Sequence, residues 1–171
     1  MTDCTSRHLR YFERIADRFS SRLKEIMKED LISVVLYGST ARGEITENSD
    51  IDLLVISKGL PSEYHDRVEA LFPVIRELYQ GDDFQSLKAE GIFPKIEYLI
   101  LDVSEAQGTN NLDFDLLTDA KILYDTGFFA EKMAILGKKL KRLGAKKVIL
   151  DKKNWYWDLK PDLKPGEVIE I

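Results

Sequence analysis

The first part of the chain alternates between apolar segments with the period of a helix and apolar segments with the length of a strand. Between residues 5 and 28, apolar side chains recur every three or four positions, which predicts an amphipathic helix with one buried face. Residues 31–37 (LISVVLY) and 51–57 (IDLLVIS) are short β-branched apolar runs, and residues 95–101 (KIEYLIL) form a third. These runs predict three strands, of which the first two are apolar enough to be central in a sheet.

Helical periodicity dominates much of the remaining chain. A second helix is expected over residues 61–80, and the segment 81–94, with its glycines, proline and mixed charges, is predicted to be a loop. A short helix capped by asparagine is expected over residues 110–117. A third long helix is expected over residues 128–143, because cations in its last turn and Gly144 just beyond it form a good C-terminal stop.

The C-terminal region contains shorter and less regular signals. Residues 122–125 are expected to be a short strand or an extended piece, and residues 146–150 a final strand. Two prolines and a glycine in residues 151–171 favour an extended tail over a helix. The Trp-Tyr-Trp run at 155–157 leaves two alternatives, since these rings can pin the tail to the domain or stack on a base.

Together these elements predict an α+β fold, in which a small mixed β-sheet has helices packed on it. The length of 171 residues favours one domain with one real core. Residues 1–103 are expected to form the core with its N-terminal helix. Residues 104–171 are expected to form a C-terminal helical extension and an extended tail that pack on the same domain.

Composition narrows the classes of function. A net charge of −5 disfavours an extended surface for duplex nucleic acid. The single cysteine, Cys4, excludes a disulfide within the chain and favours a reducing compartment. No apolar run approaches 18 residues and no signal-peptide core is visible, so we expect a cytoplasmic protein with no membrane partner. The sequence is compatible with an oligomer.

The most informative stretch is YGSTARGEITENSDID, residues 37–52. Asp50 and Asp52 stand two positions apart at the start of a predicted strand, which places both carboxylates on one face. Two such charges repel each other unless a cation lies between them, and hard oxygen ligands suit Mg²⁺ or Mn²⁺. Gly38 and Ser39 offer a close backbone approach and a hydroxyl to a phosphate group.

These residues resemble a known signature. Gly38-Ser39, ten intervening residues and Asp50-Ile51-Asp52 are similar to the motif of the nucleotidyltransferase superfamily that includes DNA polymerase beta. The stretch GSTARGEITENSDIDLLV looks most like the minimal nucleotidyltransferases, the small prokaryotic branch of that superfamily. The likeness extends over about residues 30–101 and implies the polymerase beta-like nucleotidyltransferase fold.

The resemblance also implies a third acidic residue on a neighbouring strand, for which Glu97 and Asp102 are the candidates. Glu97 lies inside the apolar strand, where a lone buried carboxylate would be expensive, whereas Asp102 lies at its end. The two have opposite parity, so at most one shares the face of the metal site. Glu97 is favoured, and the choice stays open.

The activity implied by the resemblance is metal-dependent nucleotidyl transfer. A nucleoside triphosphate, with ATP favoured, would bind with Mg²⁺ or Mn²⁺ bridging its phosphates to Asp50 and Asp52. A second metal, with Glu97 as ligand or base, would activate an acceptor hydroxyl for in-line attack and release of pyrophosphate. The phosphates would be contacted by Gly38, Ser39 and Arg42. Arg42 suits this role because a guanidinium matches phosphate geometry.

Several acceptors are compatible with the sequence. The small size and the spacing of the motif resemble antitoxin enzymes that adenylylate a partner toxin of the HEPN type, which implies a protein acceptor. A small molecule or an RNA end is an alternative acceptor. A second hypothesis is a catalytically silent module that binds a nucleotide or a partner protein, since a fold alone does not decide function.

Overall fold

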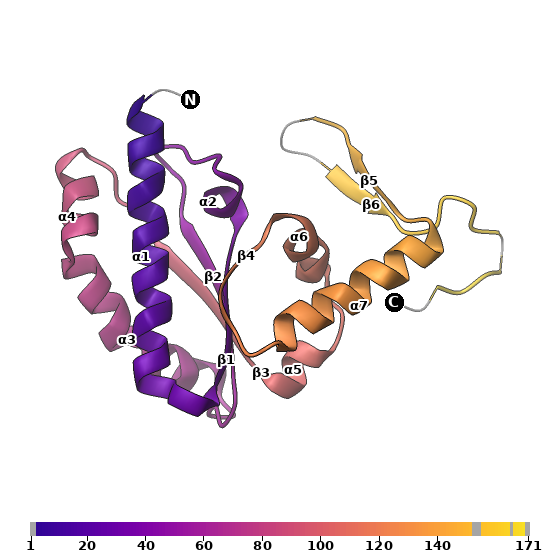
Figure 1. Cartoon of the computed structure of the whole chain (residues 1–171), viewed down its shortest axis with the longest axis horizontal. Coiled ribbons are helices and arrows are strands. Elements are labelled where there is room, and N and C mark those ends of the chain that lie inside the picture. The colour runs from indigo at the N-terminus through magenta and orange to yellow at the C-terminus, as the bar shows by residue number, and fades with distance from the viewer. Residues whose placement is uncertain (1–2, 152–154, 165, 170–171) are drawn as a thin grey trace.

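The computed structural model describes residues 3–151, 155–164 and 166–169, and Figure 1 shows their arrangement. The helices are α1 (Asp3–Met27), α2 (Gly38–Arg42), α3 (Tyr64–Gln80), α4 (Asp82–Ala89), α5 (Val103–Gln107), α6 (Asn111–Asp119) and α7 (Phe128–Leu143). The strands are β1 (Leu31–Tyr37), β2 (Ile51–Ser57), β3 (Ile96–Asp102), β4 (Lys121–Asp125), β5 (Lys146–Ile149) and β6 (Trp155–Asp158). Part of the predicted extended tail, at 152–154, 165 and 170–171, lies outside the described residues.

Four of these strands form one mixed sheet in the order β3-β2-β1-β4. β1 pairs antiparallel with both β2 and β4, and β2 pairs parallel with β3. The predicted small mixed sheet is thus confirmed. The expected boundary after residue 103 falls just inside α5, and the segment beyond it contributes the edge strand β4 as well as helices.

Helices cover both faces of this sheet, and each face has its own hydrophobic core (Figure 1). On one face, Leu53 and Val55 of β2 pack in a cluster with residues of α1, α3 and α4. On the other, Leu54 and Ile56 pack in a cluster with residues of α5, α6 and α7. Burial on both faces explains why β1 and β2 are continuously apolar in the sequence. By parity, Asp52 shares the face of Leu54 and Ile56.

Most predicted elements are confirmed with small differences at their ends. The helix predicted over 128–143 is α7, and Gly144 beyond it has φ 71°, the left-handed conformation that ends many helices. α3 begins at Tyr64 instead of 61. Residues 146–150 and the tail run at 155–157 form a separate two-stranded hairpin, β5–β6. None of the described helices is long and apolar enough to cross a membrane.

The predicted loop over 81–94 is wrong in its first half, which forms α4. Two acidic residues occupy the first turn of this helix, where they favour its N-terminus. Phe84 and Leu87, three positions apart, are both buried. Two apolar positions in eight residues are too few to show a helical period, so the sequence pattern did not indicate this helix. The short helices α2 and α5 were not predicted for the same reason.

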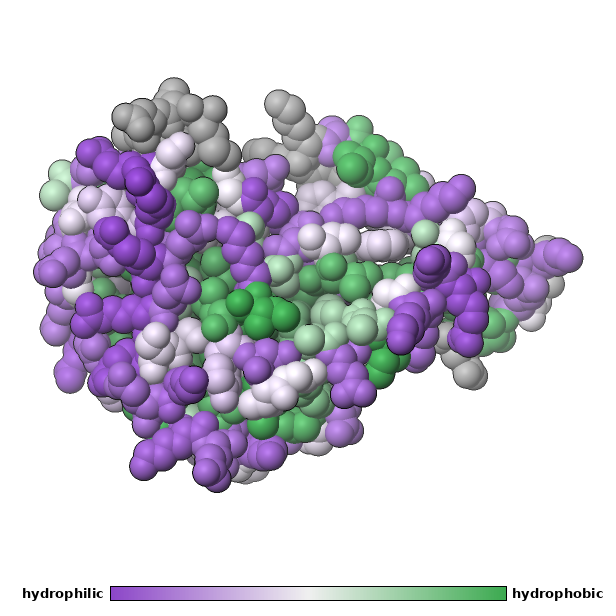
Figure 2. Space-filling model, viewed as in Figure 1, coloured by the Kyte–Doolittle hydropathy of each residue, from purple (hydrophilic) through white to green (hydrophobic). Residues whose placement is uncertain are grey.

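β4 forms the edge of the sheet next to β1, between α1 and α7. Figure 2 shows hydrophobic side chains gathered over this part of the visible face. The strand is only five residues long and begins with Lys121, whose ammonium pairs with Glu13 of α1 at 2.6 Å. A short edge strand with a lysine limits pairing with other sheets.

An ion pair between Asp113 and Lys132 joins α6 to α7 beneath the second core. The ammonium and carboxylate are 2.7 Å apart, and the Asp113 side chain is only 2% exposed. The Asp113 carboxylate also accepts the backbone N–H of Asn110 in the capping box that begins α6. This pair therefore joins two of the helices that cover the sheet face of Leu54, Ile56 and Asp52.

Asp113→Asn should lower the free energy of unfolding by about 3 kcal/mol, because it leaves a largely buried ammonium unpaired. Urea denaturation followed by circular dichroism measures this. Glu167→Gln is the matched control, since Glu167 pairs with Lys160 at the same 2.7 Å but at the surface. The control should change stability little, and equal effects of the two variants would contradict the prediction.

Candidate active site

The predicted acidic residues meet at one end of the sheet. Tyr37 of β1 pairs in register with Asp52 of β2, and Asp52 pairs in register with Glu97 of β3. The three side chains therefore form a row across three neighbouring strands. Asp50 stands one residue before β2, and its Oδ1 accepts the backbone N–H of Lys95 at 3.0 Å. That hydrogen bond holds the start of β2 against the start of β3.

The second half of the predicted motif, Gly38 and Ser39, begins α2. Gly38 has φ +69°, a conformation that L side chains rarely adopt. A Cβ atom at this position would lie 2.1 Å from Oδ2 of Asp52. Glycine is therefore required both by the backbone conformation and by the contact with the carboxylate. The structure brings the Gly-Ser turn and the paired acids together, as the sequence predicts.

Thr40 holds this arrangement in place, although the sequence pattern did not indicate this role. Its side chain is fully buried, and its hydroxyl donates a hydrogen bond to the backbone carbonyl of Asp50 at 3.0 Å. This bond ties α2 directly to the residue that opens the acidic motif. Its neighbour Ala41 is also buried. The only signal in the sequence was the run of small residues Thr40-Ala41 directly after Gly38-Ser39.

Asp50, Asp52 and Glu97 form a row of acids whose negative charges repel each other. Burial raises the pKa of Asp52, and the negative charges of Glu97 and Asp50 raise it further, while Arg42 opposes them. Burial and the charges of Asp52 and Glu97 also raise the pKa of Tyr37 to about 12. Tyr37 is partly buried and packs against the core formed with α5, α6 and α7. The row as a whole favours a bound cation.

The donor set suits a divalent metal of the hard class. Asp50, Asp52 and Glu97 supply carboxylate oxygens only, which Mg²⁺ and Mn²⁺ prefer. Within the described ranges, no three acidic, histidine or cysteine side chains already surround a common point. Asp50 is instead turned toward the Lys95 amide.

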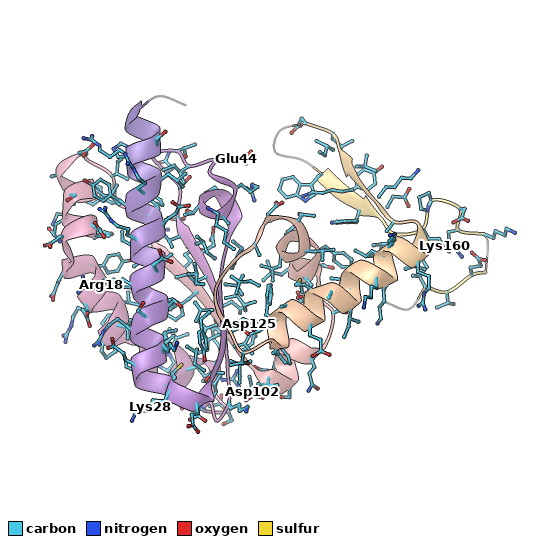
Figure 3. The ribbon with its side chains drawn as sticks, viewed as in Figure 1. Arg18, Lys28, Glu44, Asp102, Asp125 and Lys160 are labelled. Carbon is cyan, nitrogen blue, oxygen red and sulfur yellow. The ribbon has the colours of Figure 1, made fainter. Side chains whose placement is uncertain are left out.

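The alternative third acid, Asp102, lies at the opposite end of the sheet. Figure 3 shows it far from Glu44, which follows α2. Asp102 pairs in register with Ser57, and its carboxylate accepts the backbone N–H of Ser104 at 2.9 Å as the N-cap of α5. These hydrogen bonds lower the pKa of Asp102. Of the two candidates, only Glu97 is placed beside Asp52.

Arg42 lies at the end of α2 and contacts several elements. Its Nε donates to Glu44 at 2.9 Å, and its guanidinium is 3.5 Å from Asp119 of α6. The same group lies over the ring of Trp155 of β6, 5.6 Å from the ring centroid. The sequence gives no signal for these contacts, because the residues are separated by up to 113 positions.

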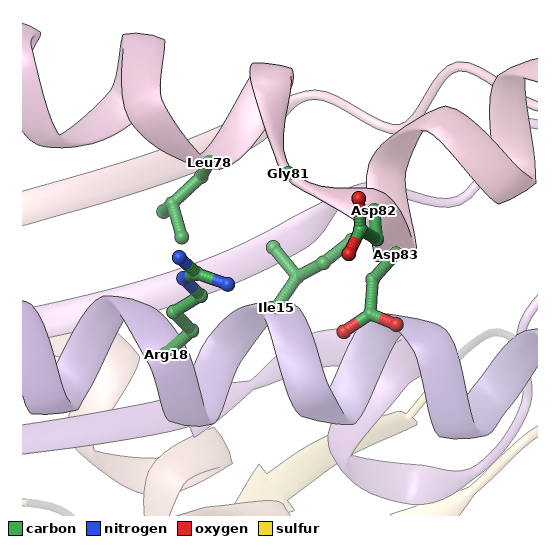
Figure 4. Close-up of a pocket in the computed structure, with 6 residues that line it drawn as sticks. All are labelled: Ile15, Arg18, Leu78, Gly81, Asp82 and Asp83. Carbon is green, nitrogen blue, oxygen red and sulfur yellow. The ribbon is translucent and has the colours of Figure 1, made fainter.

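The pocket in Figure 4 is a different feature of the molecule. It has a volume of about 130 Å³ and lies between α1 and the α3–α4 junction, lined by Ile15, Arg18, Leu78, Gly81, Asp82 and Asp83. These elements cover the sheet face opposite to Asp52. The pocket is therefore separate from the acidic site.

Comparison with known proteins assigns the class. The sequence model of the nucleotidyltransferase domain family matches residues 20–165, which is most of the chain. The chain therefore belongs to this family and is a nucleotidyltransferase. The resemblance to the nucleotidyltransferases seen in the sequence is confirmed.

Individual relatives refine this assignment. Two proteins of Methanocaldococcus jannaschii, both provisionally named protein adenylyltransferases, are similar to this chain. One is 38% identical over 117 residues, which is 67% of this chain and 73% of the relative. The other is 40% identical over 48 residues, which is 28% of this chain and 48% of the relative.

Solved structures show more distant likenesses. A provisionally named nucleotidyltransferase from Sulfolobus solfataricus has a TM-score of 0.45 and 20% identity, over 71% of this chain and 86% of that one. A toxin–antitoxin with AMP-PNP has a TM-score of 0.41 and 17% identity, over 75% of this chain and 92% of that one. The assignment to the family rests on the sequence matches and not on these.

On the expectation that Asp52 takes part in the reaction, Gly38→Ala should lower the rate of nucleotidyl transfer by about 100-fold, because misplacing a reacting group by about 1 Å has effects of this size. The rate is measured as pyrophosphate release from ATP. Gly59→Ala is the matched control, since Gly59 has a similar φ of +63° but nothing within 4 Å of its would-be Cβ. Both variants should lose about 1–2 kcal/mol of stability from backbone strain, and equal transfer rates would refute the role of the Gly38 contact.

Proposed function

We propose that this protein transfers a nucleoside monophosphate, with ATP as the favoured donor, to an acceptor hydroxyl and releases pyrophosphate. The observation that carries the proposal is the contact of Gly38 with Asp52, which is itself in register with Glu97. A phosphate-binding turn and a row of acids are thereby joined in one site. Membership in the nucleotidyltransferase family supports the reaction class.

In this proposal, Asp50, Asp52 and Glu97 hold divalent metal ions, Mg²⁺ or Mn²⁺. When bound, such ions neutralise phosphate charge and lower the pKa of an attacking hydroxyl. The row of carboxylates fits this role because its members repel each other and are partly open to solvent. Glu97, which is exposed and at the edge of the row, is the proposed acceptor of the proton from the attacking hydroxyl.

The phosphate side of the site belongs to α2. Gly38 lacks a side chain, so the backbone can approach a phosphate without obstruction. Ser39 is half-buried beside it and supplies a hydroxyl. Arg42, one turn further along, supplies a guanidinium whose donors match phosphate oxygens. Gly38, Ser39 and Arg42 are the proposed nucleotide-binding residues.

A protein is the proposed acceptor. The relatives in M. jannaschii carry the provisional name of protein adenylyltransferase, which supports transfer of AMP to a polypeptide hydroxyl. An antitoxin that adenylylates a partner toxin is the specific form of this proposal that the sequence resemblance implies. The cytoplasm, where ATP and such a partner are present, is the proposed location.

Asp50→Asn, Asp52→Asn and Glu97→Gln should each reduce transfer of label from α-labelled ATP by at least about 100-fold, because each removes a proposed metal ligand. Mass spectrometry of a co-expressed partner protein identifies the modified hydroxyl. Asp102→Asn is the control and should keep its rate, since its carboxylate caps α5 far from the row.

The reverse pattern, with Asp102 required and Glu97 dispensable, would assign the third acid to Asp102. Binding of ATP without any transfer in the wild-type protein would favour the catalytically silent module. Transfer to an RNA end or a small molecule, with no labelled protein, would retain the enzyme but exclude the proposed acceptor.

Asp52→Asn should make the metal-free protein more stable at pH 7, although it abolishes transfer. The folded state raises the pKa of Asp52, so its ionised form is destabilising above that pKa and the penalty disappears as pH falls through it. We expect the melting temperature in EDTA to rise because the variant removes the repulsion. The rise should be only about 2 °C, since solvent already screens part of that repulsion.

Differential scanning calorimetry at several pH values tests this expectation. The gain should vanish at acidic pH, where protonation neutralises Asp52 in the wild-type protein. Added Mg²⁺ should stabilise the wild type more than Asp52→Asn. An equal effect of Mg²⁺ on both proteins would show that Asp52 does not bind the metal.

A further inference from the structure

A cluster of charged and aromatic side chains joins the nucleotide side of the site to the C-terminal hairpin. Trp155 of β6 lies under two cations, Arg42 at 5.6 Å and Lys147 at 4.8 Å from the ring centroid. Asp119, the last residue of α6, is 3.5 Å from Arg42 and 3.6 Å from Lys147. We refer to Arg42, Asp119, Lys147 and Trp155 as the Trp155 cluster.

Hydrogen bonds fix the orientation of this cluster. The indole N–H of Trp155 donates to Asp115 of α6 at 3.1 Å. The Lys147 ammonium donates to the Thr118 hydroxyl at 2.9 Å. Because both residues of the hairpin are tied to the same helix, the ring of Trp155 cannot turn without breaking a hydrogen bond. The ring is therefore a fixed surface against which Arg42 packs.

Arg42 keeps N–H donors that its neighbours in the described part of the chain leave available. Asp119 is shared between two cations, and its Oδ2 is buried without a hydrogen bond from any described residue. The other carboxylate near Arg42 is Glu44, whose side chain is 61% exposed. Arg42 donates only its Nε in a hydrogen bond, to Glu44, so several of its five N–H donors are unused by the described residues.

Arg42 is also close to the reacting end of the site. It lies in the same short helix as Gly38, which touches Asp52. Arg42 is thus held one turn after Gly38 and Ser39, which contact the phosphates of the nucleotide in the proposed function.

We propose that Trp155 and Asp119 are positioning residues that hold Arg42 ready for the phosphates of the nucleotide. The inference rests on the proposed function and extends it to the C-terminal hairpin. A free arginine side chain has many rotamers, and ordering them on binding weakens affinity. The aromatic face and the shared carboxylate restrict these rotamers before the nucleotide arrives. The β5–β6 hairpin thus belongs to the nucleotide site although it contributes no catalytic residue.

The first test separates binding from chemistry. Trp155→Ala should raise the KM for ATP about fivefold, the size expected for loss of a cation–π contact, and leave kcat within about twofold. Trp155→Phe keeps an aromatic face and should restore most of the lost affinity. Trp157→Phe is the control in the same strand, because Trp157 packs on Phe114 and not on Arg42.

The second test does not depend on turnover. The chain has two tryptophans, so Trp157→Phe leaves Trp155 as the only one, and its emission is followed with excitation selective for tryptophan. Titration of this variant with Mg²⁺ and a non-hydrolysable ATP analogue should change the Trp155 emission until the site is saturated. The same titration with Arg42→Gln added should show little emission change, although calorimetry still detects weakened binding.

The outcomes distinguish this inference from the proposed function. If the wild type binds and uses ATP, but Trp155→Ala keeps its KM and Trp155 emission is unaffected at saturation, the positioning role is wrong and the proposed function stands. If Trp155→Ala lowers kcat and leaves KM unchanged, the hairpin acts on another step and the inference also fails. If the wild type binds no nucleotide, both proposals fall together.

Discussion

The close approach of Gly38 to the Asp52 carboxylate is the constraint on which the rest of the site depends. No Cβ fits between them, and Gly38 also adopts a positive φ at the start of α2. Only glycine satisfies both requirements at this residue. The hydroxyl of buried Thr40 then ties α2 to the carbonyl of Asp50. The end of β1, the start of α2 and the start of β2 consequently form one rigid corner. A ligand that contacts α2 is brought against the acids by the backbone itself.

The same corner places like charges side by side. Asp52 has Glu97 in register on one side and Asp50 two residues away, and the folded state raises its pKa. A fold selected for stability alone would not collect carboxylates at this point, since burial without a counter-charge is unfavourable. Perturbed carboxylates at the edge of a core are typical of sites where charge is needed for binding or catalysis.

The elements with a strong local signal could be predicted from the sequence. The continuous apolar runs of β1 and β2, the amphipathic α1 and the glycine-terminated α7 carry their structure in local periodicity. α4 has only two buried apolar side chains, so its pattern is indistinguishable from a loop. In the site, the Gly-Ser turn and the aspartate pair were recognisable because they are close in sequence.

The remaining parts of the site depend on pairing between distant segments. The choice between Glu97 and Asp102 needed the register of β3 against β2, which parity alone could not provide. Arg42 meets Trp155 and Asp119 only because α6 and the hairpin fold over α2. No local pattern reports such contacts. The fold gives the positions of Glu97, Arg42 and Trp155, whereas their roles in catalysis or binding stay predictions.

The position of β4 at the edge of the sheet has a consequence for how the chain is made. Its partner β1 is synthesised early, but β4 comes from residues 121–125, after β3 and two helices. A growing chain that has just completed β3 already contains the acidic row, yet one side of β1 still has unpaired N–H and C=O groups. Such an open strand invites pairing with a neighbouring nascent chain. Once β4 is synthesised, it pairs with residues 33–36 of β1 and closes this side of the strand. This role is separate from the acids, which lie on the β2 side of β1.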